Sequence, residues 1–304
     1  MKRLFLSLIF LGAVGLVSAQ VPATAGVDSL STAMDGLMEV YIKENIPFKR
    51  PITFAHVREA DVAQEWTVWR QLDLRQRANL PLYFPTNPKR IGSRVNLFDL
   101  LIKGVESGEI TAYDPMTIAD EFAANQIRTY EQIVGNPMLQ FEDTEQRQTS
   151  PFTGLDTLII LPGLNVLDEF SPMRLVVKEK WYFNRRLSRL ECRVIGLQPI
   201  FIFSRADPGG GDPRPYYVPV MWIYMDEARP LLARHPVYND FNEAQNISYD
   251  DFFMQHRYDG LIVKESNIFN NRLISEYMNG LDALHEAARI KDEVFNWEQD
   301  LWVY

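Results

Sequence analysis

The chain has 304 residues, of which 46% are hydrophobic and 23% charged, and its formal net charge at pH 7 is −9. This composition is typical of one or two globular domains. An acidic chain is a poor candidate for binding nucleic acid or anionic membranes, because proteins bind both through basic patches. The single cysteine, Cys192, excludes an internal disulfide.

Residues 1–19 have the pattern of a secretory signal peptide. Two basic residues precede the apolar run 4–17, and small residues that end at Ala19 form a cleavage site. The apolar run is shorter than the roughly 20 residues that a membrane-spanning helix needs. We therefore expect cleavage after Ala19 and a soluble exported protein, 20–304, without direct membrane insertion.

The first half of the remaining chain is predicted to be mainly helical. Asp61 and Asn96 are suitable helix caps, and Pro47 and Gly108 are suitable helix ends. Residues 69–74 fit a helix or a strand. The predicted elements are helices at 30–46, 61–69, 96–107 and 117–133, and a strand at 110–113.

The second half is predicted to contain more strands. It follows a polar, turn-rich stretch, 136–156, which predicts a linker. The predicted elements are a β-hairpin at 173–203, a strand at 216–225, a helix at 226–233, a helix and a strand joined at Gly260, and a C-terminal helix at 281–302. The whole predicts an α+β fold: an N-terminal α/β unit (20–135), a C-terminal α/β unit (157–304) with an insertion at 203–236, and a C-terminal helix.

The two units echo each other in sequence, which favours a duplication. The alternative is two unrelated helix–glycine–strand turns. The matched positions are Asn96 with Ser248, Asp99 with Asp251, Gly108 with Gly260, Ile110 with Ile262, and Pro81 with Pro199.

The glycine run 209–211 does not fit a phosphate-binding loop. Asp207 and Asp212 flank it, each is followed by a proline, and no Gly-Lys-Ser/Thr follows. A phosphate loop needs free backbone N–H groups at a helix start and a lysine. We expect a flexible, exposed connection between two strands.

No other pattern predicts catalytic, cofactor-binding or metal-binding residues. His285 begins a near match to a zinc-protease motif, but Arg289 stands where a second histidine is needed. The adjacent carboxylates Asp250 and Asp251 are predicted to cap a helix or to lie on the surface. Cys192 lies in an apolar run and is predicted to be a small buried hydrophobe.

Several long motifs of the chain resemble a known family. They include "HVREADVAQEWTVWRQLDLRQRANLPLYFP", "NLFDLLIKGVESGEITAYD", "KEKWYFNRRLSRLECRVIGLQP" and "GLDALHEAARIKDEVFNWEQDLW". From about His56 to Trp302 the chain is similar to the gliding motility protein GldN, called PorN in non-gliding bacteria. The variable stretch 20–50 carries no resemblance.

The resemblance implies a non-catalytic periplasmic component of the type IX secretion system, without a cofactor. It implies self-association in a ring with the lipoprotein GldK/PorK beneath the outer membrane, and contact with the periplasmic part of the motor protein GldM/PorM. The alternative is a periplasmic hydrolase or small-ligand-binding protein with dispersed site residues.

Three C-terminal aromatic residues are the candidate interface: Trp297, Trp302 and Tyr304. Aromatic side chains are enriched at the centres of interfaces. We expect the other side of their helix to face the core through apolar residues, namely Leu281, Leu284, Ala288 and Phe295. The alternative is that the two tryptophans fix this helix to its own domain.

Overall fold

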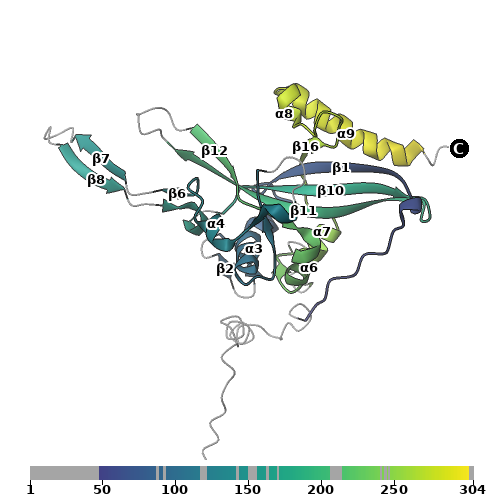
Figure 1. The fold of residues 1–304 in the computed structure, drawn as a ribbon, viewed down its shortest axis with the longest axis horizontal. Coiled ribbons are helices and arrows are strands. Elements are labelled where there is room, and N and C mark those ends of the chain that lie inside the picture. Colours follow the sequence, from purple (N-terminus) through teal and green to yellow (C-terminus); the bar gives the residue numbers. More distant parts are fainter. Residues whose placement is uncertain are drawn as a thin grey trace, which may run out of the picture. The chain divides into compact units, whose positions relative to one another are not determined.

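Long antiparallel strands run through the centre of the molecule, and helices pack around them (Figure 1). The computed structural model describes residues 48–86, 89–91, 94–116, 122–141, 144–149, 156–161, 164–169, 171–205, 214–239, 242, 245 and 247–300. These residues belong to one unit, Lys43–Tyr304. The predicted signal peptide and the predicted helix at 30–46 lie outside them.

The described elements have the following bounds. The strands are β1 (Val62–Asp73), β2 (Arg90–Ile91), β3 (Arg94–Val95), β4 (Ala112–Tyr113), β5 (Ile127–Arg128), β6 (Gln140–Phe141), β7 (Thr144–Thr149), β8 (Asp156–Leu161), β9 (Leu164–Asn165), β10 (Arg174–Asn184), β11 (Arg189–Arg205), β12 (Arg214–Pro219), β13 (Trp222–Tyr224), β14 (Pro236–Val237), β15 (Ile247–Ser248) and β16 (Leu261–Glu265). The helices are α2 (Leu80–Tyr83), α3 (Leu97–Glu106), α4 (Tyr130–Val134), α5 (Val166–Glu169), α6 (Met225–Ala233), α7 (Tyr249–Met254), α8 (Ile274–Tyr277) and α9 (Leu281–Asp300), with 3-10 turns η1 (Glu59–Asp61) and η2 (Ala124–Gln126).

The main sheet has the strand order β16-β1-β10-β11-β13-β4-β5, and β12 pairs with β11. Neighbouring strands pair antiparallel. β10 and β11 form the predicted hairpin, which closes with Asn184 opposite Arg189. Helices combined with an antiparallel sheet and a C-terminal helix confirm the predicted α+β class.

Strand β1 corrects one expectation. We expected a helix at 61–69, but the chain is extended from Val62 and lies between β10 and β16. Valine, threonine and tryptophan favour strands, and neighbours on both sides satisfy the backbone of β1. Because β1 pairs with two strands from the second half of the chain, the predicted units 20–135 and 157–304 share one sheet.

Two further predictions differ from the structure. The helix expected at 117–133 is replaced, in its described part, by η2, β5 and the short helix α4. The expected linker 136–156 contains β6 and β7, and β7 pairs with β8. Polar strands such as β7 lack the apolar alternation from which a strand is recognised.

The helix starts of the sequence echo are matched in the structure. The side chain of Asn96 caps α3 by accepting from the backbone N–H of Phe98 at 2.8 Å, and Ser248 caps α7 in a capping box with Asp251. Asp99 and Asp251 are each the third residue of their helix. The proline pair of the echo has no structural counterpart, since Pro81 lies in α2 and Pro199 in β11.

The glycine run connects two paired strands. β11 and β12 pair antiparallel as far as Arg205 opposite Arg214, and the connection between them lies outside the described residues. On β12, Pro215 and Pro219 have no N–H with which to donate.

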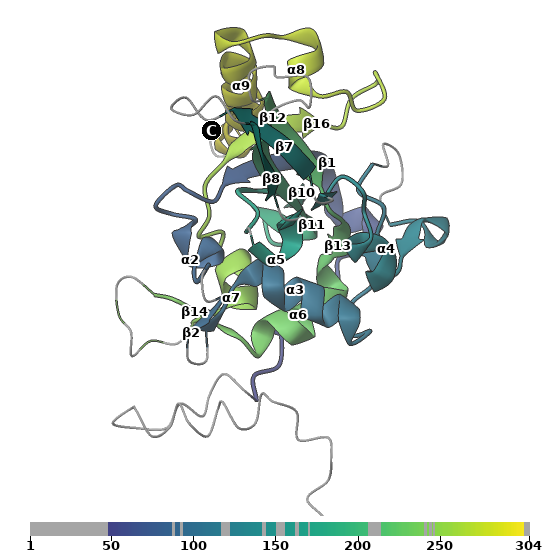
Figure 2. The same cartoon turned by 90° about the vertical axis from the view of Figure 1, so that its left-hand side faces the viewer.

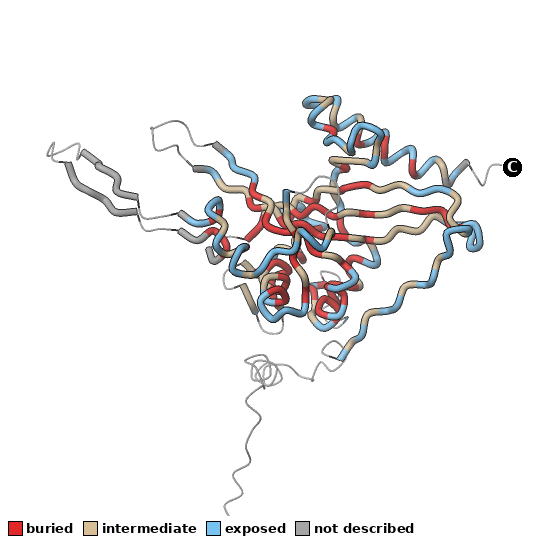
Figure 3. The backbone as a smooth tube through the Cα atoms, in the orientation of Figure 1, coloured by how far each residue is buried: buried red, intermediate tan, exposed pale blue. Residues whose placement is uncertain are grey.

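Helices gather at two places with the strands between them (Figure 2). α3, α6 and α7 lie together and bury the larger group of side chains, here called the main core (Figure 3). Its fully buried members include Leu72, Leu101, Leu175, Leu197, Phe201 and Phe253. α8 and α9 lie beside β16 and bury a smaller group, here called the α9 cluster, which consists of Val68, Ile262, Ile274, Ala287 and Ile290.

Candidate functional site

The one described member of the candidate interface, Trp297, packs against its own sheet. Its ring meets Trp66 of β1 edge-on at 5.4 Å between centroids and Phe183 of β10 at 4.9 Å. These contacts support the alternative in which this tryptophan fixes α9 to its domain. Trp302 and Tyr304 lie outside the described residues, and the assignment of an interface to the three aromatics stays a prediction.

Helix α9 has a different buried side from the one we expected. Ala287, Ile290 and Val294 are buried. Leu281 is 67% exposed and Phe295 is 57% exposed, so the expectation that they fill the core side is wrong. Two apolar stripes follow helical spacing on α9, and only contact with β16 decides which one is buried.

The outward apolar residues of α9, Leu281, Leu284, Ala288 and Phe295, are here called the outer stripe. Beside them an open hollow is lined by residues of α9 alone, among them His285 and Arg289. Arg289 donates to Glu286 and Glu293, each at 2.8 Å, so its charge is already paired. This surface suits contact with another protein better than enclosure of a small ligand.

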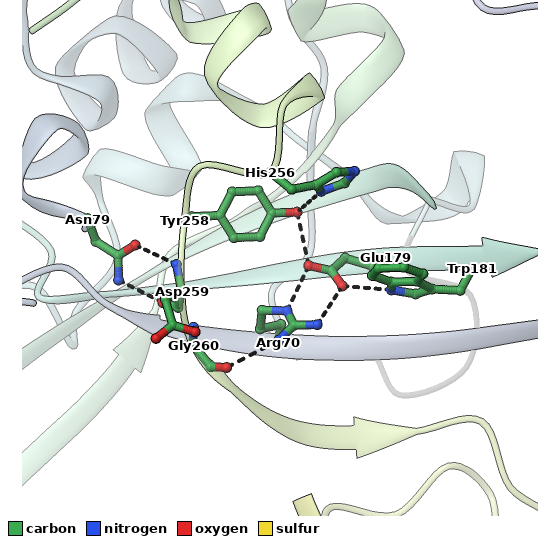
Figure 4. A network of polar contacts seen from close by, with 8 residues as sticks. All are labelled: Arg70, Asn79, Glu179, Trp181, His256, Tyr258, Asp259 and Gly260. Atoms are coloured by element: carbon green, nitrogen blue, oxygen red, sulfur yellow. Dashed lines mark hydrogen bonds and ion pairs between the residues drawn. The ribbon is translucent and has the colours of Figure 1, made fainter. Parts of the chain in front are cut away.

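A buried carboxylate, Glu179 of β10, is the centre of a network of polar contacts (Figure 4). Arg70 of β1 donates to both of its oxygens, at 2.9 Å from Nε and 3.2 Å from Nη2. The Trp181 indole N–H and the Tyr258 hydroxyl each donate at 2.9 Å. Four donors therefore satisfy a carboxylate that is only 1% exposed.

The network continues from Glu179 to the turn after α7. His256 Nδ1 lies 3.0 Å from the Tyr258 oxygen, and the histidine has a left-handed φ of 48°. Burial and the nearby Glu179 charge raise the pKa of Tyr258 well above its ordinary value, and burial lowers the pKa of His256. Tyr258 thus stays protonated and donates to Glu179 throughout the neutral range.

The same network fixes the connection between α7 and β16. Arg70 Nη1 donates to the Gly260 carbonyl at 3.2 Å, and Asn79 exchanges hydrogen bonds with the backbone of Asp259 at 2.8 and 3.1 Å. A Cβ on Gly260 would lie 2.5 Å from the carbonyl oxygen of Gln71, so only glycine fits there. Glu179 and Tyr258 at the centre of the network are buried and hydrogen-bonded, so the network holds β1, β10 and the turn after α7 together.

A second buried ion pair joins α6 to α7. Arg229 donates to Asp250 at 2.8 Å, and both side chains are nearly inaccessible to solvent. The expectation that Asp250 caps a helix or lies on the surface is therefore wrong, because the carboxylate points to a neighbouring helix. Asp251 does cap α7, as predicted.

Three further features bear on function: a thiol, the grouping of side chains that can ligate a metal, and the length and polarity of the helices. Cys192 of β11 is half-buried, where we expected a fully buried residue, and burial raises the pKa of its thiol. In the described part of the chain, no three His, Cys, Asp or Glu side chains are grouped so that they could hold a metal ion. Among the same residues, every helix is too short or too polar to cross a membrane.

The sequence match to a protein family covers nearly all of this structure. The family model described as "Gliding motility associated protein GldN" matches residues 57–303, more than three quarters of the chain. The chain belongs to the GldN family. GldN proteins are structural components of gliding motility and type IX secretion, and the family is not a known enzyme family. The comparison with curated proteins finds no match.

The GldN match includes the residues that sequence reasoning missed. Arg70, Glu179 and Tyr258 come from β1, β10 and the turn after α7, and each stands alone among ordinary strand or loop residues. No local spacing pattern links them. Only the pairing of β1 with β10 brings Arg70 next to Glu179. The outer stripe, in contrast, is visible in the sequence, but it was assigned to the core side.

Proposed function

We propose that this GldN-family chain is a non-catalytic structural subunit of the type IX secretion system that works in the periplasm. In this proposal it forms a ring with a GldK/PorK-type lipoprotein, which keeps it at the outer membrane, and it contacts the periplasmic part of a GldM/PorM-type motor protein.

The outer stripe of α9 is the observation that carries the proposal. The helix is attached to the sheet on one side and presents a second apolar stripe to solvent, with Leu281 and Phe295 more than half exposed. Exposed apolar patches on a folded protein mark contacts with other proteins. The charged groups of Glu179 and Arg229 are engaged in hydrogen bonds within the fold, which supports a structural role and not a catalytic one.

Cofractionation of the mature chain tests the assembly. We expect the chain to copurify with the lipoprotein in a particle of very high mass. A small discrete species, free of the lipoprotein, would contradict the proposal and support the alternative of a periplasmic hydrolase or ligand-binding protein.

Variants of α9 test which surface makes the contact. The double variant Leu284→Asp with Phe295→Asp changes the outer stripe and should yield a folded chain that no longer copurifies. Lys291→Glu, an exposed change on the same helix, is the control and should copurify.

Truncation after Asn296 tests the predicted interface of Trp297, Trp302 and Tyr304. A folded product that no longer binds the lipoprotein supports the interface, and an unfolded product places these aromatics in the core.

A further inference from the structure

Residues 48–58 form an extended segment before β1, without helix or strand. It leaves the start of β1 and runs to α6 and α7 (Figure 1). None of its residues is buried, and Phe48 and Ile52 are 84% and 69% exposed. Apolar burial, which holds most elements of a fold in place, therefore contributes little to its position.

Two arginines hold the segment through hydrogen bonds to its backbone carbonyls and through contacts with one aromatic ring. Arg193 of β11 donates to the Ala55 carbonyl at 2.7 Å and lies 4.7 Å from the Phe54 ring. Arg229 of α6 donates to the Ile52 carbonyl and lies 4.2 Å from the same ring. Backbone hydrogen bonds combined with a cation–π contact are a means of recognising an extended peptide with an aromatic residue at one position.

A third contact adds charge selectivity. Lys49, five residues before Phe54, forms an ion pair with Asp251 of α7. The surface made by Arg193, Arg229 and Asp251, here called the segment groove, thus matches a lysine followed five positions later by an aromatic residue.

The segment groove is organised without help from its occupant. Asp250 holds the Arg229 guanidinium at 2.8 and 3.3 Å, and Asp251 is fixed by its capping contact with Ser248. Arg193 also lies over the Tyr182 ring at 5.5 Å. A site whose groups are positioned in advance binds its partner at a lower entropic cost.

We propose that this segment is exchanged between copies, so that residues 49–55 of one chain occupy the segment groove of the next. The proposal rests on the self-association proposed above, and it adds how neighbouring copies are linked. The sequence that demonstrably fits the groove is the chain's own, and every copy in an assembly carries it. The same contacts form within a chain or between chains, so exchange needs no new recognition.

The geometry permits the exchange. Among the described residues, the hydrogen bonds and ring contacts of 49–55 go to β11, α6 and α7, and none goes to β1, so a turn at 56–58 redirects the segment without breaking the sheet. The seven residues 49–55, fully extended, span about 25 Å, enough to reach a subunit in direct contact. Each copy gives one segment and receives one, which is the head-to-tail contact that closes a ring.

Site-specific photo-cross-linking tests the exchange on the full chain. Phe54 is replaced by p-benzoylphenylalanine, which keeps an aromatic ring at this position, and the particle purified with the lipoprotein is irradiated. We expect covalent dimers on a denaturing gel, with cross-linked peptides that join position 54 to β11 or α6. Adding Arg193→Ala, in a variant whose circular dichroism is unchanged, should remove most of the dimer band.

The outcomes separate the exchange from the assembly. A purified particle that yields only monomers cross-linked within the chain overturns the exchange and leaves the ring in place, as does a cross-link to a different protein. Dimers without a lipoprotein particle support the exchange and contradict the proposed function. Monomers without a particle overturn both.

Discussion

The main core and the α9 cluster attach helices to the same strands in different ways. α3, α6 and α7 bury large side chains such as Leu101, Leu232 and Phe253, which are 0% exposed. α9 buries a narrow stripe with the smaller Ala287 beside Ile290 and Val294. Full burial of a large apolar side chain is worth about 1.5–3 kcal/mol, so the main core carries most of the stability.

The difference explains how one domain can combine a fixed body with a surface for contact. A helix that is buried on one stripe only can keep its other residues for a partner. It can also separate from the sheet at a lower cost than global unfolding.

The largest effect is expected at Glu179, which connects the two regions by accepting from Tyr258 of the main core and from Trp181 beside α9. Glu179→Gln leaves the charge of Arg70 buried without its partner, and breaking such a pair costs about 3–5 kcal/mol. Denaturant unfolding measures the loss. The control is Glu65→Gln, which removes an exposed ion pair with Lys180 and should cost below about 1 kcal/mol. Equal losses would contradict the assigned role of Glu179.

A matched pair of truncations compares the regions directly. Leu101→Ala in α3 should lower the free energy of unfolding by about 2–5 kcal/mol. Ile290→Ala in α9 should lower it less, because the helix can separate from the sheet locally. Hydrogen exchange should then become faster across 281–300 and stay unchanged in α3. A global loss from Ile290→Ala as large as that from Leu101→Ala would show that α9 belongs to the main core.

Two glycines provide a smaller contrast. A Cβ on Gly260 meets the backbone of Gln71 at 2.5 Å, whereas a Cβ on Gly196 meets the tip of the Phe122 ring at 2.4 Å. Backbone cannot move aside as a ring can, so Gly260→Ala should cost about 1–3 kcal/mol and Gly196→Ala less. Thermal unfolding shows which variant loses more stability. A larger loss for Gly196→Ala would contradict the close backbone contact assigned to Gly260.

The smallest effect is expected at acidic pH, where the ion pair at the start of α7 is lost. Burial alone would raise the pKa of Asp251, but hydrogen bonds from Lys49 and Ser248 outweigh it and hold that pKa below its ordinary value. The ion pair therefore adds stability above the unfolded-state pKa of about 4 and loses it as the pH falls through the lower folded-state pKa. Protection from hydrogen exchange at 49–57, measured relative to the intrinsic rate at each pH, should fall over this acid range in the native chain. Asp251→Asn should abolish the pH dependence, and an unchanged dependence in that variant would assign it to another group.

The sequence predicted those parts of the fold that depend on neighbours in the chain. Asn96 and Ser248 cap their helices through the next few residues, and the hairpin of β10 and β11 closes over a short turn. The first part of β1, residues 62–69, is predicted as a helix because Val62, Trp66 and Trp69 also fit helical spacing, and the pattern of 69–74 leaves helix and strand open. Its partners β10 and β16 lie far along the chain, and local spacing does not reveal them.

The candidate sites show the same limit in side-chain chemistry. Asp250 was expected at the surface because nothing near it in sequence indicates Arg229, which belongs to another helix. On α9 the sequence shows two apolar stripes of similar strength, and the choice between them depends on how the helix meets β16. Contacts between distant segments thus decided the positions of β1, Asp250 and the buried side of α9, which local patterns did not reveal.

Strand β12 has a consequence for how copies of this protein behave when crowded together. An edge strand with free N–H groups can recruit the edge of another molecule and start uncontrolled sheet growth. Pro215 and Pro219 remove two of those donors from a six-residue strand, Arg214–Pro219. Copies of a chain that carries such an edge are less prone to join edge to edge, even at high local concentration.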